Sequence, residues 1–121
     1  MKAKNLVVAA VAAFGCVFTS VAFAHAKLEA SMPQANAVVT PAPTQVRLQF
    51  NEQVELPFSK VKLVDEKGAV VEPSKKVLDA DNPKVLVATV PALHSGAYRV
   101  KWSTVTRDGH KVKGEFAFRV K

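Results

Sequence analysis

Residues 98–120, with the sequence YRVKWSTVTRDGHKVKGEFAFRV, decide the fold of this chain. Apolar side chains occupy alternate positions on both sides of the central Arg107-Asp108-Gly109-His110 motif: Tyr98, Val100 and Trp102 before it, and Val112, Phe116, Phe118 and Val120 after it. A period of two is typical of a strand with one buried face. An Asp-Gly pair between two such runs predicts a β-hairpin.

The same alternation predicts further strands upstream of this hairpin at residues 46–50 and 61–63, and a more continuous apolar run predicts a strand at residues 85–90. Turn-forming residues at positions 66–68, 81–83 and 94–96 separate the strands. After position 24, no window shows the apolar spacing of three and four residues that a helix requires. We therefore expect an all-β domain, either a two-sheet Greek-key sandwich or a small barrel. Its core would contain Tyr98, Trp102, Phe116 and Phe118.

The first 24 of the 121 residues have the composition of a secretory signal peptide. Lys2 and Lys4 precede an apolar run at residues 6–18, which is too short to span a bilayer. Ala22-Phe23-Ala24 then supplies the small residues that a signal peptidase recognises. We expect cleavage before His25, a mature domain of residues 25–121 and a periplasmic location.

Cys16, the only cysteine, lies inside this predicted signal. An alternative is that Cys16 carries a lipid, which would leave His25 inside the chain. The Ala-Phe-Ala motif lies at a better distance after the apolar run and favours cleavage before His25. Without Cys16 the mature chain has no thiol and no disulfide.

The charge balance argues against nucleic acid as a partner. The chain carries 17 Lys and Arg against 10 Asp and Glu, a net charge of +7, and loss of Lys2 and Lys4 would reduce it to +5. Basic and acidic residues are interspersed, with no run of five basic residues, which predicts a solvated surface. The sequence also lacks a Gly-rich phosphate loop, a Gly-x-Ser-x-Gly elbow and a cysteine metal motif. We therefore assign no catalytic residues and expect a protein that is not an enzyme.

His25, Asp108 and His110 are the candidate metal ligands. A histidine at a mature N-terminus can chelate one ion through its α-amine and its imidazole Nδ1, and that amine deprotonates readily because its ordinary pKa is near 8. Asp108 and His110 are two residues apart, so on an extended segment their side chains would leave the same face. Three nitrogens and one oxygen suit Cu(II) best. The plain alternative is a hairpin turn whose Asp caps its own backbone, beside an unrelated His25.

The mature chain resembles the CopC family of periplasmic copper-binding proteins nearly from end to end. The matching motifs are His25-Ala26-Lys27-Leu28, Ser31-Met32-Pro33, Phe50-Asn51-Glu52, Phe58-Ser59, Gly96-Ala97-Tyr98, Trp102 with Asp108-Gly109-His110, and Gly114-Glu115-Phe116-Ala117-Phe118. The resemblance implies a seven-stranded, cupredoxin-like (Ig-like) Greek-key barrel. It also implies one Cu(II) per chain, bound by His25, Asp108 and His110, with Glu52 as an outer-shell partner.

As a function, the resemblance implies a copper carrier or buffer in copper homeostasis or resistance, monomeric by default, with an inner-membrane copper protein of the CopD type as a possible partner. Some family members also hold Cu(I) in a methionine-rich loop. The mature chain keeps only Met32, and soft thioether ligands are what select Cu(I), so we expect no such site. His94 is expected to be an exposed turn residue and is left out of the ligand set.

Two other function classes remain open from the sequence. An N-terminal histidine with a second histidine also resembles the histidine brace of copper oxygenases. In a brace enzyme one in-plane position stays open for oxygen, whereas here Asp108 would fill it, which suits holding the ion. A non-metal Ig-like interaction module would leave the coincidence of His25 and Asp-Gly-His unexplained.

Overall fold

The computed structural model describes residues 27–121. The predicted signal peptide at residues 1–24, with Cys16, and the predicted ligand His25 lie outside the described residues. Within residues 27–121, no helix is long and apolar enough to cross a membrane.

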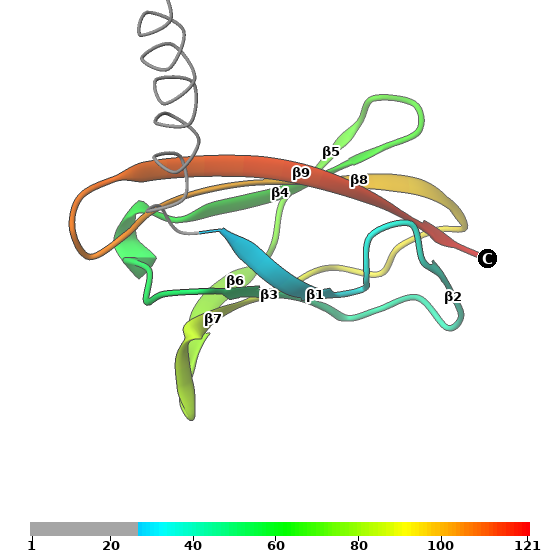
Figure 1. The fold of residues 1–121 in the computed structure, drawn as a ribbon. Coiled ribbons are helices and arrows are strands. Elements are labelled where there is room, and N and C mark those ends of the chain that lie inside the picture. Colours follow the sequence, from blue (N-terminus) through cyan, green and yellow to red (C-terminus); the bar gives the residue numbers. More distant parts are fainter. Residues whose placement is uncertain (1–26) are drawn as a thin grey trace, which may run out of the picture.

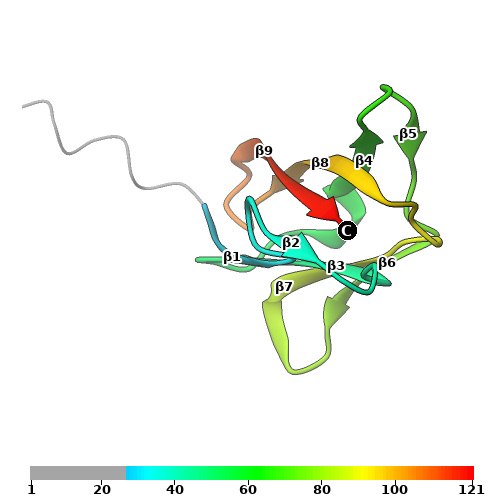
Figure 2. The same cartoon turned by 90° about the vertical axis from the view of Figure 1, so that its right-hand side faces the viewer.

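Two β-sheets pack face to face (Figures 1 and 2). The four-stranded sheet has the order β1 (Leu28–Met32), β3 (Gln45–Phe50), β7 (Asn82–Thr89) and β6 (Lys75–Asp79). The five-stranded sheet has the order β2 (Val38–Val39), β9 (Lys111–Val120), β8 (Gly96–Val105), β4 (Lys60–Asp65) and β5 (Val70–Val71). A single short 3-10 turn, η3 (Leu56–Phe58), is the only helical element among the described residues.

The predicted all-β, two-sheet fold is confirmed. Seven of the described strands have five residues or more, and β2 and β5 add two residues each. Every strand that the apolar pattern predicted is present. The turn predicted at residues 81–83 is wrong by one to two residues, because Asn82 already pairs with Asp79 and the turn occupies residues 80–81.

Four strands of the structure had no counterpart among the predictions, namely β1, β2, β5 and β6. All four are edge strands of their sheets. An edge strand has a partner on one side only and exposes much of its surface, so its sequence need not alternate between apolar and polar residues. In β1, for example, no residue is fully buried.

The core lies between the two sheets. Leu48 and Phe50 of β3 face Leu63 of β4 and Val100 of β8, and all four side chains have no exposed surface. The ring of Phe50 meets that of Trp102 edge to face, with ring centroids 5.1 Å apart, so this pair joins the sheets. Of the predicted core aromatics, Tyr98, Trp102 and Phe118 are buried, and Phe116 is partly buried against the same cluster.

Three segments that are distant in sequence lie at one end of the sandwich: the start of β1, η3 and the loop between β8 and β9 (left in Figure 1). Residues 51–55, which follow β3, connect them. Lys27 N–H donates to Asn51 Oδ1 (2.8 Å), and Asn51 N–H donates to the Lys27 carbonyl (3.1 Å). Val54 forms a bridge with Thr106. The first described residue is therefore held close to the β8–β9 loop.

Candidate metal centre

The β8–β9 hairpin carries Asp108 and His110 at its tip. The two strands pair without interruption from Gly96 with Val120 to Val105 with Lys111. In the loop, Thr106 N–H donates to the His110 carbonyl and Gly109 N–H donates to the Thr106 carbonyl, each over 2.9 Å. The predicted hairpin is confirmed.

Asp108 and His110 meet at this tip, although not for the reason that the sequence suggested. They do not lie on an extended segment: Asp108 is in a turn, and Gly109 has a φ of 91°, in the left-handed region that favours glycine. This turn brings His110 Nδ1 to 3.0 Å from Asp108 Oδ2. About half of each side chain remains exposed, 51% for His110 and 57% for Asp108, so both are accessible to an ion from solvent.

Thr106 supports both of these residues, and the sequence reasoning missed it. Its hydroxyl donates to Asp108 Oδ1 and accepts a hydrogen bond from the His110 N–H (3.2 Å). Thr106 is itself 1% exposed, so the hydroxyl is fixed by the core beneath it. The available signal was a threonine two residues before an aspartate in a turn, a spacing at which side chains often bond to nearby polar groups.

The hydroxyl of Thr106 and then the imidazole of His110 hold the pKa of Asp108 below its ordinary value of 3.8. The carboxylate is thus ionised at neutral pH, which is the form that binds a metal. Each of its oxygens keeps further lone pairs besides the one used by its present donor.

Among residues 27–121, no group of three or more His, Cys, Asp or Glu side chains could hold a metal ion. The described residues therefore contribute a pair of candidate ligands, Asp108 and His110. The third predicted ligand, His25, lies outside this range. Glu52, although predicted near the site, does not form a three-residue cluster of metal ligands with Asp108 and His110.

Glu52 nevertheless belongs to the segment that runs beside the hairpin. On one side of it, Asn51 binds Lys27, and on the other, Gln53 Oε1 accepts a hydrogen bond from Arg107 Nη1 over 3.3 Å. Glu52 itself is partly buried. This placement is compatible with the outer-shell role predicted for it.

His94 lies in the loop between β7 and β8, beyond the opposite end of β8 from the hairpin. It is exposed, as predicted, and its backbone carbonyl accepts a hydrogen bond from the Tyr98 hydroxyl (2.9 Å). Ten residues of extended strand separate it from the hairpin loop, roughly 30 Å. His94 cannot share an ion with Asp108 and His110.

The fold and the hairpin together define a two-sheet β-sandwich with an Asp-x-His pair at one end. The CopC domain model matches residues 28–121, and the chain belongs to the CopC family. YobA from Escherichia coli (strain K12) is 40% identical over 101 residues, which cover 82% of this chain and 81% of YobA.

Two crystal structures with the same fold confirm this placement. CopC from Methylosinus trichosporium OB3b superposes with a TM-score of 0.72 at 32% identity, covering 80% of this chain and 94% of that one. PcoC, a methionine rich copper resistance protein from Escherichia coli, superposes with a TM-score of 0.70 at 34% identity, covering 81% of this chain and 100% of that one.

Proposed function

We propose that this protein is a periplasmic Cu(II)-binding protein that acts as a copper carrier or buffer in copper homeostasis or resistance. One observation carries the proposal: the hairpin brings Asp108 and His110 within 3.0 Å at the end of the sandwich where the described chain begins. Membership of the CopC family, with PcoC named as a copper resistance protein, supports copper as the ion.

The proposed ligands are the α-amine and imidazole of His25, the carboxylate of Asp108 and the imidazole of His110. Lys27 is anchored to Asn51, and two residues extend a chain by at most about 7 Å. This short separation from an anchored residue supports His25 as a ligand. Removal of residues 1–24 by signal peptidase would create the α-amine ligand, so the precursor would lack the complete site.

Three nitrogens and one oxygen suit the tetragonal preference of Cu(II). With all four positions in the plane filled by protein, the site would hold the ion and leave no in-plane position for oxygen, which favours storage over an oxygenase reaction. Glu52 would act from the outer shell. The stoichiometry would be one ion per monomer, with delivery to an inner-membrane protein of the CopD type as the proposed transfer step.

A methionine-rich Cu(I) site is not part of this proposal. Met32 is the only methionine after residue 24, and it lies at the end of β1 with 61% of its surface exposed. A single exposed thioether does not form the soft ligand set that selects Cu(I). The chain differs in this respect from PcoC, which is described as methionine rich.

The first test is the N-terminal sequence and intact mass of the exported protein, followed by electron paramagnetic resonance with one equivalent of Cu(II). We expect His25 at the N-terminus and a tetragonal, nitrogen-rich signal. An alanine inserted before His25 keeps every side chain but moves the α-amine, so it should weaken Cu(II) binding and change the signal. An unchanged spectrum in that variant would exclude the amine as a ligand.

Single substitutions test the hairpin ligands. Asp108→Ala and His110→Ala should each weaken Cu(II) binding at least about tenfold without unfolding the sandwich, because both side chains are half exposed. Asp81→Ala and His94→Ala are matched controls, since both residues are exposed and neither lies in the hairpin. A copper titration that His110→Ala leaves unchanged would refute the proposed site.

A further inference from the structure

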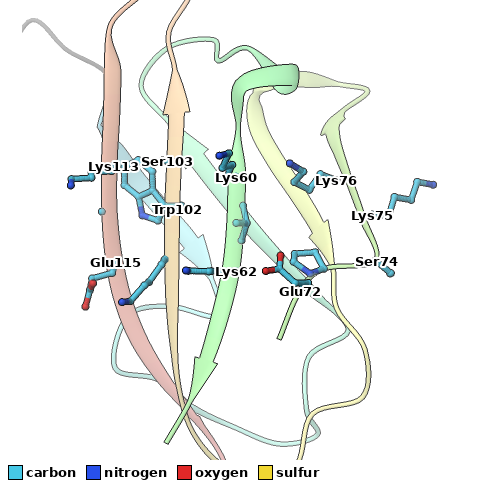
Figure 3. Close-up of a pocket in the computed structure, with 14 residues that line it drawn as sticks. Lys60, Lys62, Glu72, Ser74, Lys75, Lys76, Trp102, Ser103, Lys113 and Glu115 are labelled. Atoms are coloured by element: carbon cyan, nitrogen blue, oxygen red, sulfur yellow. The ribbon is translucent and has the colours of Figure 1, made fainter. Parts of the chain in front are cut away.

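A hollow of about 890 Å³ lies along β4, β8 and β9 and is bounded on its other side by residues 72–76 (Figure 3). We call it the basic groove, because six lysines line it: Lys60, Lys62, Lys75, Lys76, Lys101 and Lys113. None of them belongs to the candidate metal centre.

The basic groove carries an excess of positive charge. Its acidic residues are Glu72 and Glu115, so six lysines outnumber the acids by four. Glu115 is already paired with Arg99, with 3.3 Å between Arg99 Nε and Glu115 Oε2. Several positive side chains around one hollow raise the local potential and attract anions.

The strand register concentrates this charge. Lys62 of β4 lies directly opposite Lys101 of β8, where like charges repel each other and destabilise the strand pair. Lys60 is two residues before Lys62, so its side chain leaves the same face about 7 Å away. Lys101 also lies opposite Glu115 of β9, but Glu115 is paired with Arg99, so an anionic partner would add negative charge beside Lys62 and Lys101.

The spacing of these lysines matches a polyanion whose charges lie about 7 Å apart. In an extended polypeptide, carboxylates at every second residue also lie about 7 Å apart on one face, which matches Lys60 and Lys62. A planar membrane surface cannot enter a hollow with a wall on one side, and a single phosphate would meet only part of the row. We propose that the basic groove binds an extended acidic segment of a partner protein.

The groove begins close to the hairpin tip. Lys113 follows His110 by three residues, a separation of about 10 Å along a strand. A docked segment would thus place its protein beside Asp108 and His110. Docking itself needs no metal, and only its use in copper transfer depends on the proposed function.

The test uses a short fluorescent peptide of alternating Glu and Thr, with alternating Gln and Thr as the uncharged control, and measures fluorescence anisotropy with the mature protein at low and high salt. We expect the Glu peptide to bind at low salt and the Gln peptide not to bind. The triple variant Lys60→Gln/Lys62→Gln/Lys101→Gln should bind the Glu peptide about tenfold more weakly.

The matched control removes the same charge elsewhere. Lys67→Gln/Lys84→Gln/Lys121→Gln changes three exposed lysines that do not line the groove, so it should weaken binding less than about twofold. An equal loss in both triple variants would show a response to net charge alone and would overturn the proposal. Absence of binding would also overturn the proposal. The lysines would then protect residues 60–62 of β4, which lie beyond the residues that pair with β5, against pairing with other chains.

Two further measurements separate this proposal from its competitors. Tighter binding of phosphatidylglycerol vesicles or a single-stranded oligonucleotide, lost in the groove variant, would overturn the acidic polypeptide as the partner. The groove variant should keep the parent's Cu(II) titration, and His110→Ala should keep peptide binding. Failure of the copper site and failure of the docking site therefore give different results.

Discussion

Thr106 shows how much one buried hydroxyl group does at the tip of the β8–β9 hairpin. It donates to Asp108, accepts from the His110 N–H and is held by the core. Supporting groups of this kind orient ligands and adjust their protonation. Their removal typically lowers metal affinity by about ten- to a hundredfold.

Thr106→Val should therefore weaken Cu(II) binding about tenfold while keeping both proposed hairpin ligands. Valine has nearly the shape of threonine, but it cannot donate to Asp108. The pKa of Asp108 should also rise toward its ordinary value, because the Thr106 hydroxyl is the main cause of the lowered pKa. Copper titration and an NMR titration of the Asp108 carboxyl in the metal-free protein measure the two effects.

Thr104→Val provides the control for this substitution. Thr104 is also buried, but its hydroxyl shares a hydrogen bond with Ser59 (2.6 Å), which is not a proposed ligand. Its loss should lower the free energy of unfolding by about 1 kcal/mol and leave copper binding unchanged. If Thr104→Val weakened copper binding as much as Thr106→Val, the effect would be one of general stability.

Asp79 and Arg47 give a prediction for pH. Their side chains form an ion pair of 2.7 Å across the four-stranded sheet, and with the Asp81 N–H the Arg47 guanidinium holds the pKa of Asp79 below 3.8. Since the folded pKa lies below the unfolded one, the pair stabilises the fold above pH 3.8, and this contribution is lost as the pH falls through the folded pKa.

Asp79→Asn should thus be slightly less stable than the parent at neutral pH, and the difference should shrink in acid. Urea unfolding of the two proteins at several pH values measures it. A difference that stays constant down to the lowest pH would mean that the ionisation of Asp79 does not contribute.

At the scale of elements, Gly114 allows β8 and β9 to pair at the position of Trp102. The two residues are cross-strand neighbours, and a Cβ on Gly114 would lie 2.6 Å from Cζ2 of the Trp102 ring. The ring is held in the core by its edge-to-face contact with Phe50. Close strand pairing here therefore requires glycine.

Gly114→Ala should lower the free energy of unfolding by about 1–3 kcal/mol, because either the indole or the strand must shift. Denaturant unfolding measures the loss. In a Trp102→Phe background the smaller ring leaves more space, and the same change should cost less. Equal costs in both backgrounds would show that the indole is not the obstacle.

Apolar periodicity predicted the inner strands and not the edge strands. Val100 and Leu63 lie in strands with neighbours on both sides, and burial requires an apolar residue at every second position. In β6, the edge strand with the sequence KKVLD, no residue is fully buried, so only the pairing with β7 identifies it as a strand.

At the scale of the whole molecule, both sheets contribute to one core. Leu48→Ala should lower the free energy of unfolding by about 2–5 kcal/mol, because Leu48 has no exposed surface and its truncation leaves a cavity. Val70→Ala is the surface control: Val70 is 52% exposed, and its truncation should change stability by less than about 0.5 kcal/mol. Comparable losses would contradict the core described between the sheets.

The candidate site could be predicted only in part, because one of the contacts that build this end of the sandwich joins residues far apart in sequence. Asp108 and His110 are neighbours in sequence, and a local turn is enough to bring them together. The start of β1 reaches the same end of the sandwich only through bonds between Lys27 and Asn51, which are 24 residues apart. No local pattern predicts such a contact.

By itself, the sequence determined the all-β class, the central strands, the hairpin and the Asp-x-His pair, because strand periodicity, turn chemistry and ligand spacing are local properties. The tertiary structure decided which segments meet. It placed Thr106 under the pair and set Lys62 of β4 beside Lys101 of β8, which turned charges that are dispersed along the chain into a basic groove. Strand register is fixed by packing of the whole core, and residues far apart in sequence become neighbours only when that core has formed.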